Sequence, residues 1–531
     1  MRGKERFSGR IGFVLAALGM AIGAGNIWRF PRIAAQYGSE EHGAGAFIVA
    51  WLIFLCLWSI PIMIAEFTLG KVTRHGPIGA FSKLLGKPAA WMGAFMAFTT
   101  LMIACYYSVV TGWTLKYFVA SLSDFSDLAP PTDPQAISDN YRKALDLFTS
   151  FAGTTESLLF HLAMVVIAVL IVWRGIKTGV ELLCKILMPT LFLLLMGGVY
   201  MIFRSDPGGA ALDGLNYLFD PDWNQLREPG IWIDALAQSA WSTGAGWGLI
   251  LAYGAYTRRD EDAVVNNTTA ALGNNFASIL VGLFLFPAMF SLLSAANLGD
   301  PAIRAALRDN TQAGTGMVFQ YVPFIFKNVP EYGSALTITF FAALFIAALS
   351  SLIAMYEMGI RVVEDLGASR HTAVIIIALI IAAVGGACAL DMRLFISMDW
   401  VWGVGLIIGG LAVVWAVQGY GTDRFRRKLI NETGADVKLG FGFNWFFLFI
   451  VPAQGIALLW WFLHHATTEA WRGSADPWDP FALGSTNAGT CVFWWGAALL
   501  VFMLLSPWLG KWSLRKTPEE EDPAEQEGSP S

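Results

Sequence analysis

Two glycine-rich stretches bring polar groups together with backbone that is poorly suited to a continuous helix. The first contains Gly19, Gly23 and Gly25 and is followed by Asn26, and the second is Gln238-Ser-Ala-Trp-Ser-Thr-Gly-Ala-Gly-Trp-Gly248. Each glycine weakens a helix by about 1 kcal/mol relative to alanine, so each stretch predicts a break. Carbonyl oxygens freed at a break can coordinate a cation, and the amides of a half-helix N-terminus attract an anionic group. These residues therefore predict the binding of ions and of a small charged molecule.

A simpler interpretation of the glycines is close helix packing, since Gly19 and Gly23 have the spacing of a small-residue packing face. Two interrupted segments, each beside polar residues, favour the breaks. Ser350 and Ser351 lie in another apolar segment, where serines can also bond back to their own helix. Glu66 is an ionisable residue in an apolar segment, and we expect it to brace a broken helix.

The composition places these residues in a membrane protein. Of the 531 residues, 56% are hydrophobic and 14% are charged, whereas soluble proteins carry roughly 25% charged residues. The net charge of −5 provides no basic field for nucleic acid. The cysteines show no CxxC spacing, the histidines show no metal or triad spacing with nearby acids, and the chain contains no Walker-type glycine loop. The sequence therefore predicts no catalytic residues, no enzyme and no direct coupling to ATP.

Twelve apolar windows are each long enough to cross a bilayer, which takes roughly 20 residues. The two glycine-rich stretches fall in the first and sixth windows, five apart, as an inverted repeat would place them. The predicted fold is an all-α membrane protein with 12 transmembrane helices, a 5+5 inverted repeat and broken helices 1 and 6. The windows lie near residues 11–35, 44–69, 91–121, 157–174, 180–203, 231–257, 265–296, 334–363, 373–390, 394–418, 442–464 and 490–510.

Lys and Arg collect at the N-terminus and in alternate loops, whereas the opposite loops are acid-rich, as at Asp124 and Asp127. Because short cytoplasmic loops carry the excess of basic residues, both termini are expected to be cytoplasmic. The predicted organisation is a cytoplasmic N-terminus at 1–10, a transmembrane core of helices 1–10 at 11–418, helices 11 and 12 at 419–514, and a disordered acidic cytoplasmic tail at 515–531.

The residues around the first break resemble those of the neurotransmitter:sodium symporters, of the bacterial amino-acid transporter type that includes the bacterial leucine transporter. The match runs from Gly19 to Pro31, ending Gly-Asn-Ile-Trp-Arg-Phe-Pro, and continues through Cys-Tyr-Tyr-Ser108, the second break and Met-Asp399. Broken helices and an inverted repeat are known features of this family. The resemblance implies a sodium-coupled symporter that imports a neutral amino acid by alternating access, with 11–418 as its transport core.

The resemblance also implies two sodium sites built from neutral oxygens, which suit a hard cation. The first would use the Ala21 carbonyl, the side chains of Asn26, Ser242 and Asn274, and the substrate carboxylate; Asn275 replaces Asn274 if the register shifts by one. The second would use the carbonyls of Gly19, Ile22 and Ala347 and the hydroxyls of Ser350 and Ser351.

A substrate pocket between two gates is implied by the same resemblance. The substrate carboxylate would meet the amides of Ala24 and Gly25 and the Tyr107 hydroxyl, and its ammonium group the carbonyls of Ala21, Trp241 and Ser242. The side-chain pocket would be lined by Ile103, Trp241, Gly244, Trp247, Ser351 and Met355. Arg29 with Asp399 would form the extracellular gate, and Lys4 or Arg6 with Asp365, near Tyr256, the intracellular gate.

Three positions refine the expected substrate. Gly23 stands where monoamine carriers of the family place Asp, and this favours a substrate that brings its own carboxylate. Trp247 narrows the pocket and Gly244 widens it. We expect narrowing to prevail and to select a small or medium neutral amino acid; the alternative is a larger hydrophobic amino acid accommodated over Gly244.

A chloride site is expected beside the first sodium site. Two sodium ions and a zwitterion bring positive charge into a poorly solvated site, which favours a counter-anion. Some bacterial relatives supply a carboxylate where this chain has Ser278, and Trp51 offers one N–H where chloride-dependent members place Tyr. We expect partial stimulation by chloride, held by Gln238, Ser242, Asn274 and Ser278.

Two other functions remain open on the sequence alone: a proton-coupled amino-acid carrier, and a sensor that binds an amino acid without transporting it. The tail is short for an output domain, which disfavours the sensor. The second extracellular loop lacks the cysteine pair of animal members, so we expect a multi-pass protein of a bacterial inner membrane. The expected partners are the amino acid and the lipid bilayer. The oligomeric state stays open, with a homodimer among the options.

Overall fold

The computed structural model describes residues 6–39, 41–123, 142–143, 146–206, 208–295, 299–308, 318–319, 322–327, 329, 331–473 and 475–514. Regular structure within them is helical, and one isolated bridge joins Ala44 to Pro221. The predicted all-α class is therefore confirmed. The predicted tail at 515–531, Lys4 and the acidic residues Asp124 and Asp127 lie outside the described residues.

The membrane spans agree with the predicted arrangement. Ten of the described helices are long and apolar enough to cross a membrane, and a bent pair near the N-terminus supplies an eleventh span. In the sixth predicted window the chain instead forms two short helices, 229–243 and 249–255. Neither crosses a bilayer alone, because a span takes about 20 residues, and together they account for a twelfth.

The helices follow one another along the chain with frequent short π-helical turns, marked η. Those of the first half are α1 (Arg10–Ala21), η1 (Gly25–Arg29), α2 (Phe30–Gln36), α3 (Gly45–Phe54), η2 (Leu55–Ser59), α4 (Ile60–Thr73), α5 (Pro77–Leu85), α6 (Ala90–Ser123), α8 (Thr155–Val172), η4 (Ile176–Glu181), α9 (Leu182–Arg204), α10 (Ala210–Phe219), α11 (Pro229–Thr243) and α12 (Leu249–Ala255). Those of the second half are α13 (Ala263–Ala295), α14 (Asp300–Arg308), α15 (Val322–Lys327), α16 (Gly333–Asp365), α17 (Arg370–Leu390), α18 (Met392–Tyr420), α19 (Thr422–Arg424), η7 (Phe425–Asn431), α20 (Gly442–Trp445), η8 (Phe446–Ile450), α21 (Val451–His465), α22 (Glu469–Arg472) and α23 (Ala488–Ser513). The described residues also form two short 3₁₀ turns, which carry the same symbol: η3 (Lys87–Ala89) and η5 (Gln225–Arg227).

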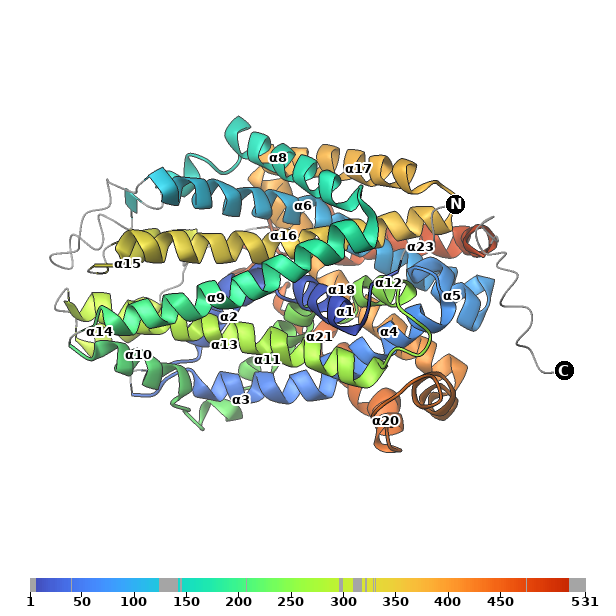
Figure 1. Ribbon diagram of the computed structural model, residues 1–531, viewed down its shortest axis with the longest axis horizontal. Helices are drawn as coiled ribbons and strands as arrows, with labels where there is room; N and C mark the ends of the chain where they lie inside the picture. The colour runs from blue at the N-terminus through green and yellow to red at the C-terminus, as the bar shows by residue number, and fades with distance from the viewer. Residues whose placement is uncertain are drawn as a thin grey trace.

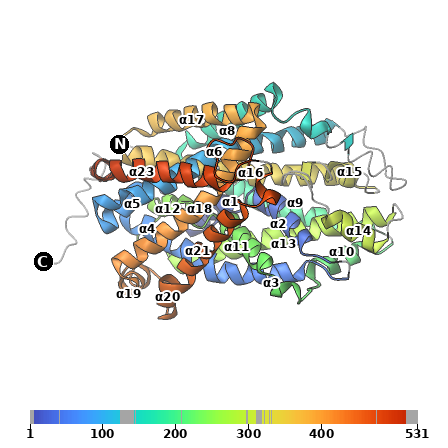
Figure 2. The ribbon, with the colours of Figure 1, turned by 180° about the vertical axis from the view of Figure 1, so that it is seen from behind.

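The bundle has an inner and an outer set of helices. Figures 1 and 2 show α1, α12 and α18 in the middle, α8 and α17 together on one side, and α3 on the opposite side. The long helix α6 packs against α16 and α18. The outer helices α9, α21 and α23 leave large apolar side chains exposed, among them Leu193, Trp460 and Leu504. Such surfaces are unfavourable in water, and a bilayer supplies the apolar surroundings that they need.

The short helices mark the two ends of the bundle. In both views α10, α14 and α15 gather at one end of the long axis, and α5 and the end of α23 lie at the other (Figures 1 and 2). The break after α1 and the break between α11 and α12 fall between these ends. The side chains of Asn26 and Ser242, one from each break, are hydrogen bonded at 3.1 Å. The fold therefore brings the two predicted breaks into contact at mid-depth.

Candidate functional site

The first break changes the hydrogen bonding of the backbone. α1 ends at Ala21, and the helix that resumes after it is bent by 52°. The Gly23 N–H donates to Asn26 Oδ1 at 2.9 Å, and the Ala24 N–H donates to the Tyr107 hydroxyl at 3.0 Å. In a continuous helix these two N–H groups would bond to the carbonyls four residues earlier, those of residues 19 and 20. The break therefore releases two carbonyls inside the protein.

The released carbonyls face a serine of α16. The buried Ser351 hydroxyl oxygen lies 3.4 Å from the Gly19 carbonyl oxygen, 3.0 Å from that of Met20 and 3.3 Å from that of Ile22. A hydroxyl has one proton, so it satisfies only one of these three acceptors at a time. A cluster of neutral oxygens with too few protons is the arrangement that a hard cation stabilises.

The remaining residues predicted for the second sodium site lie beside this cluster. Ser350 donates to the Ala347 carbonyl at 3.0 Å, as a serine bonding back to its own helix does. A Cβ at Gly19 would lie 3.3 Å from the Cβ of Ser350 and 2.9 Å from the sulfur of Cys184. Glycine thus lets α1 approach α16 closely enough to share one site. The Met20 carbonyl was missing from the predicted set, although it lies nearest to the Ser351 hydroxyl.

A second oxygen cluster lies at the contact between the two breaks. The side-chain oxygen of Asn274 accepts from the Asn26 amide at 2.8 Å, and the same atom lies 3.0 Å from the carbonyl oxygens of both Ala21 and Ser242. Turning the Asn274 amide would give the two carbonyls a donor, but it would set two amide nitrogens against each other. A cation among the three oxygens resolves this conflict without turning the amide.

The predicted residues of this cluster are all brought together. The Ser242 hydroxyl lies 2.8 Å from the Asn274 amide nitrogen and 3.1 Å from that of Asn26. Asn274, and not Asn275, is the residue that faces Ala21 and Ser242, which favours the unshifted register. The same Asn26 amide nitrogen donates to the Ser278 hydroxyl at 2.9 Å, so the predicted chloride position adjoins the cluster.

The second break is shaped by glycines and held by a buried acid. Gly244, Gly246 and Gly248 have φ values of 71°, 92° and 77°, a region that L side chains rarely adopt. The fully buried carboxylate of Glu66 accepts the N–H of Gly246 at 3.1 Å and that of Gly248 at 2.9 Å. Glu66 therefore has the bracing contacts expected from the sequence.

Open space adjoins the two breaks at Gly25 and Gly244. A Cβ at Gly25 would meet nothing within 4 Å, and a Cβ at Gly244 would meet only side-chain carbons, at 3.7 and 3.9 Å. A Cβ at Gly23, in contrast, would lie 2.8 Å from the Ser351 hydroxyl oxygen and 2.9 Å from that of Tyr107. Room for a bound molecule therefore exists beside Gly25 and Gly244, and a side chain at position 23 would collide with the Ser351 cluster.

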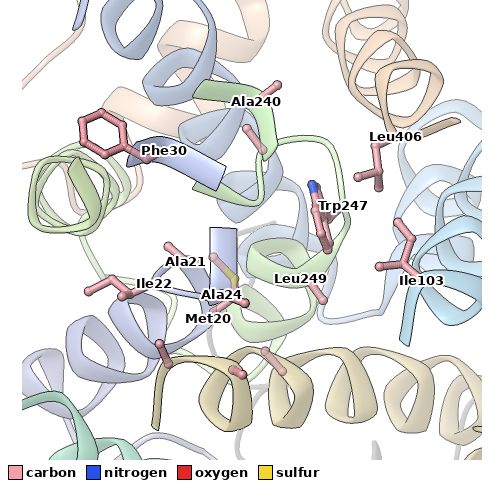
Figure 3. Packing of buried hydrophobic residues seen from close by; sticks show 14 of the residues in the cluster. Met20, Ala21, Ile22, Ala24, Phe30, Ile103, Ala240, Trp247, Leu249 and Leu406 are labelled. Atoms are coloured by element: carbon pink, nitrogen blue, oxygen red, sulfur yellow. The ribbon is translucent and has the colours of Figure 1, made fainter. Parts of the chain in front are cut away.

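The predicted side-chain pocket is aromatic. The rings of Trp241 and Trp247 meet edge to face with centroids 6.1 Å apart. Figure 3 shows Trp247 on the linker between α11 and α12, on the side that faces Ile103 of α6. Trp247, Ile103 and Met355 are buried. Trp247 therefore occupies volume that a smaller residue would leave to the substrate.

The predicted extracellular gate is not paired. Arg29 donates to Gln238 at 2.7 Å, and its guanidinium lies 5.7 Å from the centre of the Trp241 ring. Within the described residues Arg29 and Asp399 form no ion pair, and Asp399 is exposed. At the predicted intracellular gate, Asp365 pairs with Arg361 at 3.0 Å and accepts the Gly76 N–H at 2.5 Å, while Arg6 is exposed.

The gate around Tyr256 contains residues that sequence reasoning missed. The Tyr256 hydroxyl donates to Glu357 at 2.7 Å, and Arg370 pairs with the same carboxylate at 2.7 Å. The Phe7 N–H donates to the Tyr256 carbonyl at 3.1 Å, and the Phe7 ring packs on Tyr253 with centroids 5.5 Å apart. An acid inside an apolar span is itself a signal, so Glu357 could have been found by the argument applied to Glu66.

The donor at Trp51, the position that the resemblance links to chloride, has no acceptor. Trp51 is fully buried, and its indole N–H has no hydrogen-bond partner. The ring packs on Phe30 with centroids 4.6 Å apart, and Phe30 in turn adjoins Gly282, one turn along α13 from Ser278. A buried N–H without an acceptor costs free energy, so this donor is suited to an anion.

Comparison with known proteins identifies the family of the chain. The family model described as the sodium:neurotransmitter symporter family matches residues 4–129 and 133–505. An uncharacterized sodium-dependent transporter of Methanocaldococcus jannaschii is 28% identical over 447 residues, which cover 82% of this chain and 86% of the relative. The sodium-dependent neutral amino acid transporter B(0)AT2 of Mus musculus is 26% identical over 307 residues, 53% of this chain and 40% of the relative.

Among solved structures, a crystal structure of MhsT in complex with L-phenylalanine superimposes with a TM-score of 0.70 and 28% sequence identity. The match covers 86% of this chain and 99% of MhsT. The family model matches nearly the whole helical core, and the Methanocaldococcus jannaschii relative and MhsT each cover more than four fifths of the chain. The chain belongs to the sodium:neurotransmitter symporter family, whose members are multi-pass membrane transporters.

Proposed function

We propose that this protein is a secondary active symporter that imports a neutral amino acid together with sodium by alternating access. The observation that carries the proposal is the Ser351 cluster, in which one hydroxyl faces the carbonyls of Gly19, Met20 and Ile22. One proton leaves two of these three buried acceptors unsatisfied, and a cation would compensate all three at once. The sodium-dependent relatives support sodium as that cation.

The proposal assigns two sodium sites. One is the Ser351 cluster with Ala347 and Ser350; the other consists of Ala21, Asn26, Ser242 and Asn274, and is completed by the substrate carboxylate. Because both sites use carbonyls of the α1 break, each sodium ion stabilises the same bent backbone. Occupation of the sodium sites and of the substrate site is thereby coupled through one element.

The proposed substrate is an amino acid and not an amine. The Tyr107 hydroxyl and the amides near Gly25 are suited to a carboxylate at the α1 break. Position 23 has no acid to balance a lone ammonium group and no room for one. The names of MhsT with L-phenylalanine and of B(0)AT2 support a neutral amino acid. The buried Trp247 favours a small or medium side chain.

The gates suggest how access would alternate. Asp399 is exposed and unpaired with Arg29, whereas the opposite end is closed by the Phe7, Tyr256 and Glu357 contacts. We assign the open end to the outside of a bacterial inner membrane, with both termini in the cytoplasm. Substrate binding would draw Arg29 toward Asp399, and release of sodium from the Ser351 cluster would free α1 to hinge inward.

A test is uptake into proteoliposomes of a panel of labelled amino acids. We expect uptake of a neutral amino acid only with an inward sodium gradient, and competition by alanine or valine more strongly than by tryptophan. Uptake driven by an acidic exterior without sodium would identify a proton-coupled carrier instead. Binding without uptake would identify a sensor, and competition by dopamine but by no amino acid would overturn the substrate class.

A further inference from the structure

A large groove lies outside the proposed transport site, between α6, α18, α23 and the loop at 480–483. Its volume is about 780 Å³, within the range of roughly 300–1,000 Å³ that is typical of small-molecule sites. Phe98 and Met102 of α6 form part of its inner wall, Met398 and Trp402 of α18 form another part, and Trp494 belongs to its outer wall. The groove is thus formed by segments that are far apart in the sequence.

The groove offers an apolar surface with its hydroxyls already engaged. None of its lining residues is charged. The Ser397 hydroxyl accepts the Gly484 N–H at 2.9 Å, and the Thr490 hydroxyl donates to the Asn487 carbonyl at 3.0 Å. The aromatic walls are packed on one another, as shown by Phe98 and Trp402 with ring centroids 5.1 Å apart. An occupant would therefore be held by burial of apolar area and by dispersion, and not by polar recognition.

The outer wall continues into the lipid-facing surface. Trp494 and Val501 line the groove and are 43% and 49% exposed, and Leu504, one turn beyond Val501, is 73% exposed. In a multi-pass membrane protein this face of α23 contacts acyl chains and not water. Phe481 and Trp494, with ring centroids 6.4 Å apart, lie at the loop end of the groove. Aromatic residues are enriched at this level in membrane proteins, where the bilayer meets water. The groove therefore opens into the bilayer.

The length of the groove matches one leaflet. Its lining on α23 runs from Thr490 to Phe502, twelve residues apart, which at about 1.5 Å per residue is roughly 18 Å. Half of a hydrocarbon core of roughly 30 Å is about 15 Å. We propose that the groove is a lipid site that holds one acyl chain of a membrane phospholipid, with the headgroup beside the loop at 480–483.

The site would connect the bilayer to the transport core. Met102 precedes Ile103 of the proposed substrate pocket, and Met398 precedes Asp399 of the proposed gate. A chain seated in the groove contacts Met102 of α6 and Met398 of α18, so it packs on both helices next to these two positions. Lipid binding itself does not depend on the proposed function.

The test is photolabelling of the full chain in bilayers of phosphatidylethanolamine and phosphatidylglycerol. The probe is phosphatidylethanolamine with a diazirine in the middle of one acyl chain, and labelled peptides are mapped by mass spectrometry. We expect labelling concentrated on 394–402 and 490–502, several-fold above the exposed faces of α9 and α21. Even labelling of all lipid-facing helices would overturn the proposal.

Substitutions within the groove distinguish a site from general lipid contact. Ala498→Trp fills the groove, and Ala497→Leu is a milder variant should the first fold poorly. Both should abolish the concentrated labelling, whereas Ala457→Trp on the exposed face of α21 should leave it unchanged. Labelling that survives both groove variants contradicts the proposal. Groove peptides that are protected from the probe and crosslink to a second copy of the chain would show that a neighbouring subunit, and not a lipid, covers the groove.

Discussion

The Ala24 N–H donates to the Tyr107 hydroxyl at 3.0 Å, across the point where α1 is broken. The bond takes the N–H that would otherwise close the helix onto Met20, and it ties the break to α6. A single tyrosine thus helps to keep the backbone open where the proposed substrate carboxylate and sodium ions meet.

Removing the Ser351 hydroxyl should abolish sodium coupling. Ser351→Ala deletes an oxygen from a buried cluster and leaves a bound cation uncompensated, which costs free energy. We expect normal expression and no sodium-driven uptake in proteoliposomes. Ser82→Ala is the matched control, since Ser82 is also buried and bonds to its own helix at Ile78. Unchanged sodium dependence in Ser351→Ala would refute the assignment of the second sodium site.

Adding a single methyl group at position 23 should be enough to abolish binding. In Gly23→Ala the new Cβ would lie 2.8 Å from the Ser351 oxygen and 2.9 Å from the Tyr107 oxygen, so one or both hydroxyls must leave their positions at the break. We expect Gly23→Ala to lose the binding of sodium and the binding of substrate. The measurement is a scintillation proximity assay with labelled amino acid at several sodium concentrations. Gly197→Ala, where a Cβ meets nothing within 4 Å, should bind normally and gain up to about 1 kcal/mol of helix stability. Normal binding by Gly23→Ala would mean that the Ser351 cluster is looser than the geometry indicates.

Replacing the bracing carboxylate should destabilise the second break. In Glu66→Gln one oxygen becomes an NH₂ group that faces the N–H of Gly246 or Gly248, which leaves a buried donor without an acceptor. Such a group costs about 1–3 kcal/mol. We expect a clearly lower melting temperature in detergent and weaker substrate binding. Glu156→Gln, at an exposed pair with Lys116, should change little, because exposed pairs contribute at most about 1 kcal/mol. Equal melting temperatures for Glu66→Gln and Glu156→Gln would argue against a role of Glu66 in bracing the second break.

Chloride should stimulate uptake in part. The anion is proposed to bind among Gln238, Ser242, Asn274 and Ser278, with the orphan indole N–H of Trp51 as a further donor. We expect that replacing chloride by gluconate lowers sodium-driven uptake without abolishing it, and that Ser278→Glu removes this sensitivity by supplying a fixed charge. Uptake in the unaltered protein that is indifferent to gluconate would contradict the chloride site.

The sequence predicted the helical class and the position of both breaks, because glycine clusters beside polar residues disrupt a helix in an otherwise apolar window. It also predicted which side chains gather there, through the resemblance that begins at Gly19. The exchange of hydrogen bonds at Gly23 and Ala24 could not be predicted, since it depends on the distance between α1 and α6. The contacts of Phe7 and Glu357 depend on how far each end of the bundle is closed. The same is true of the ion pair between Arg29 and Asp399, which is not formed in the described structure. The groove beside α23 arises from three helices and a loop, and no local pattern in any of them indicates it.

Sodium bound as proposed at the two carbonyls released at Gly19 and Met20 would also be a determinant of protein stability. A ligand that binds the folded chain and not the unfolded chain stabilises folding by mass action, by about 2.7 kcal/mol at a hundred times its dissociation constant. Buried acceptors that lack a full set of partners raise the free energy of the sodium-free fold. The same sodium gradient that would drive transport would therefore also act on the folded population, so that a protein facing a sodium-poor solution is the form most exposed to unfolding.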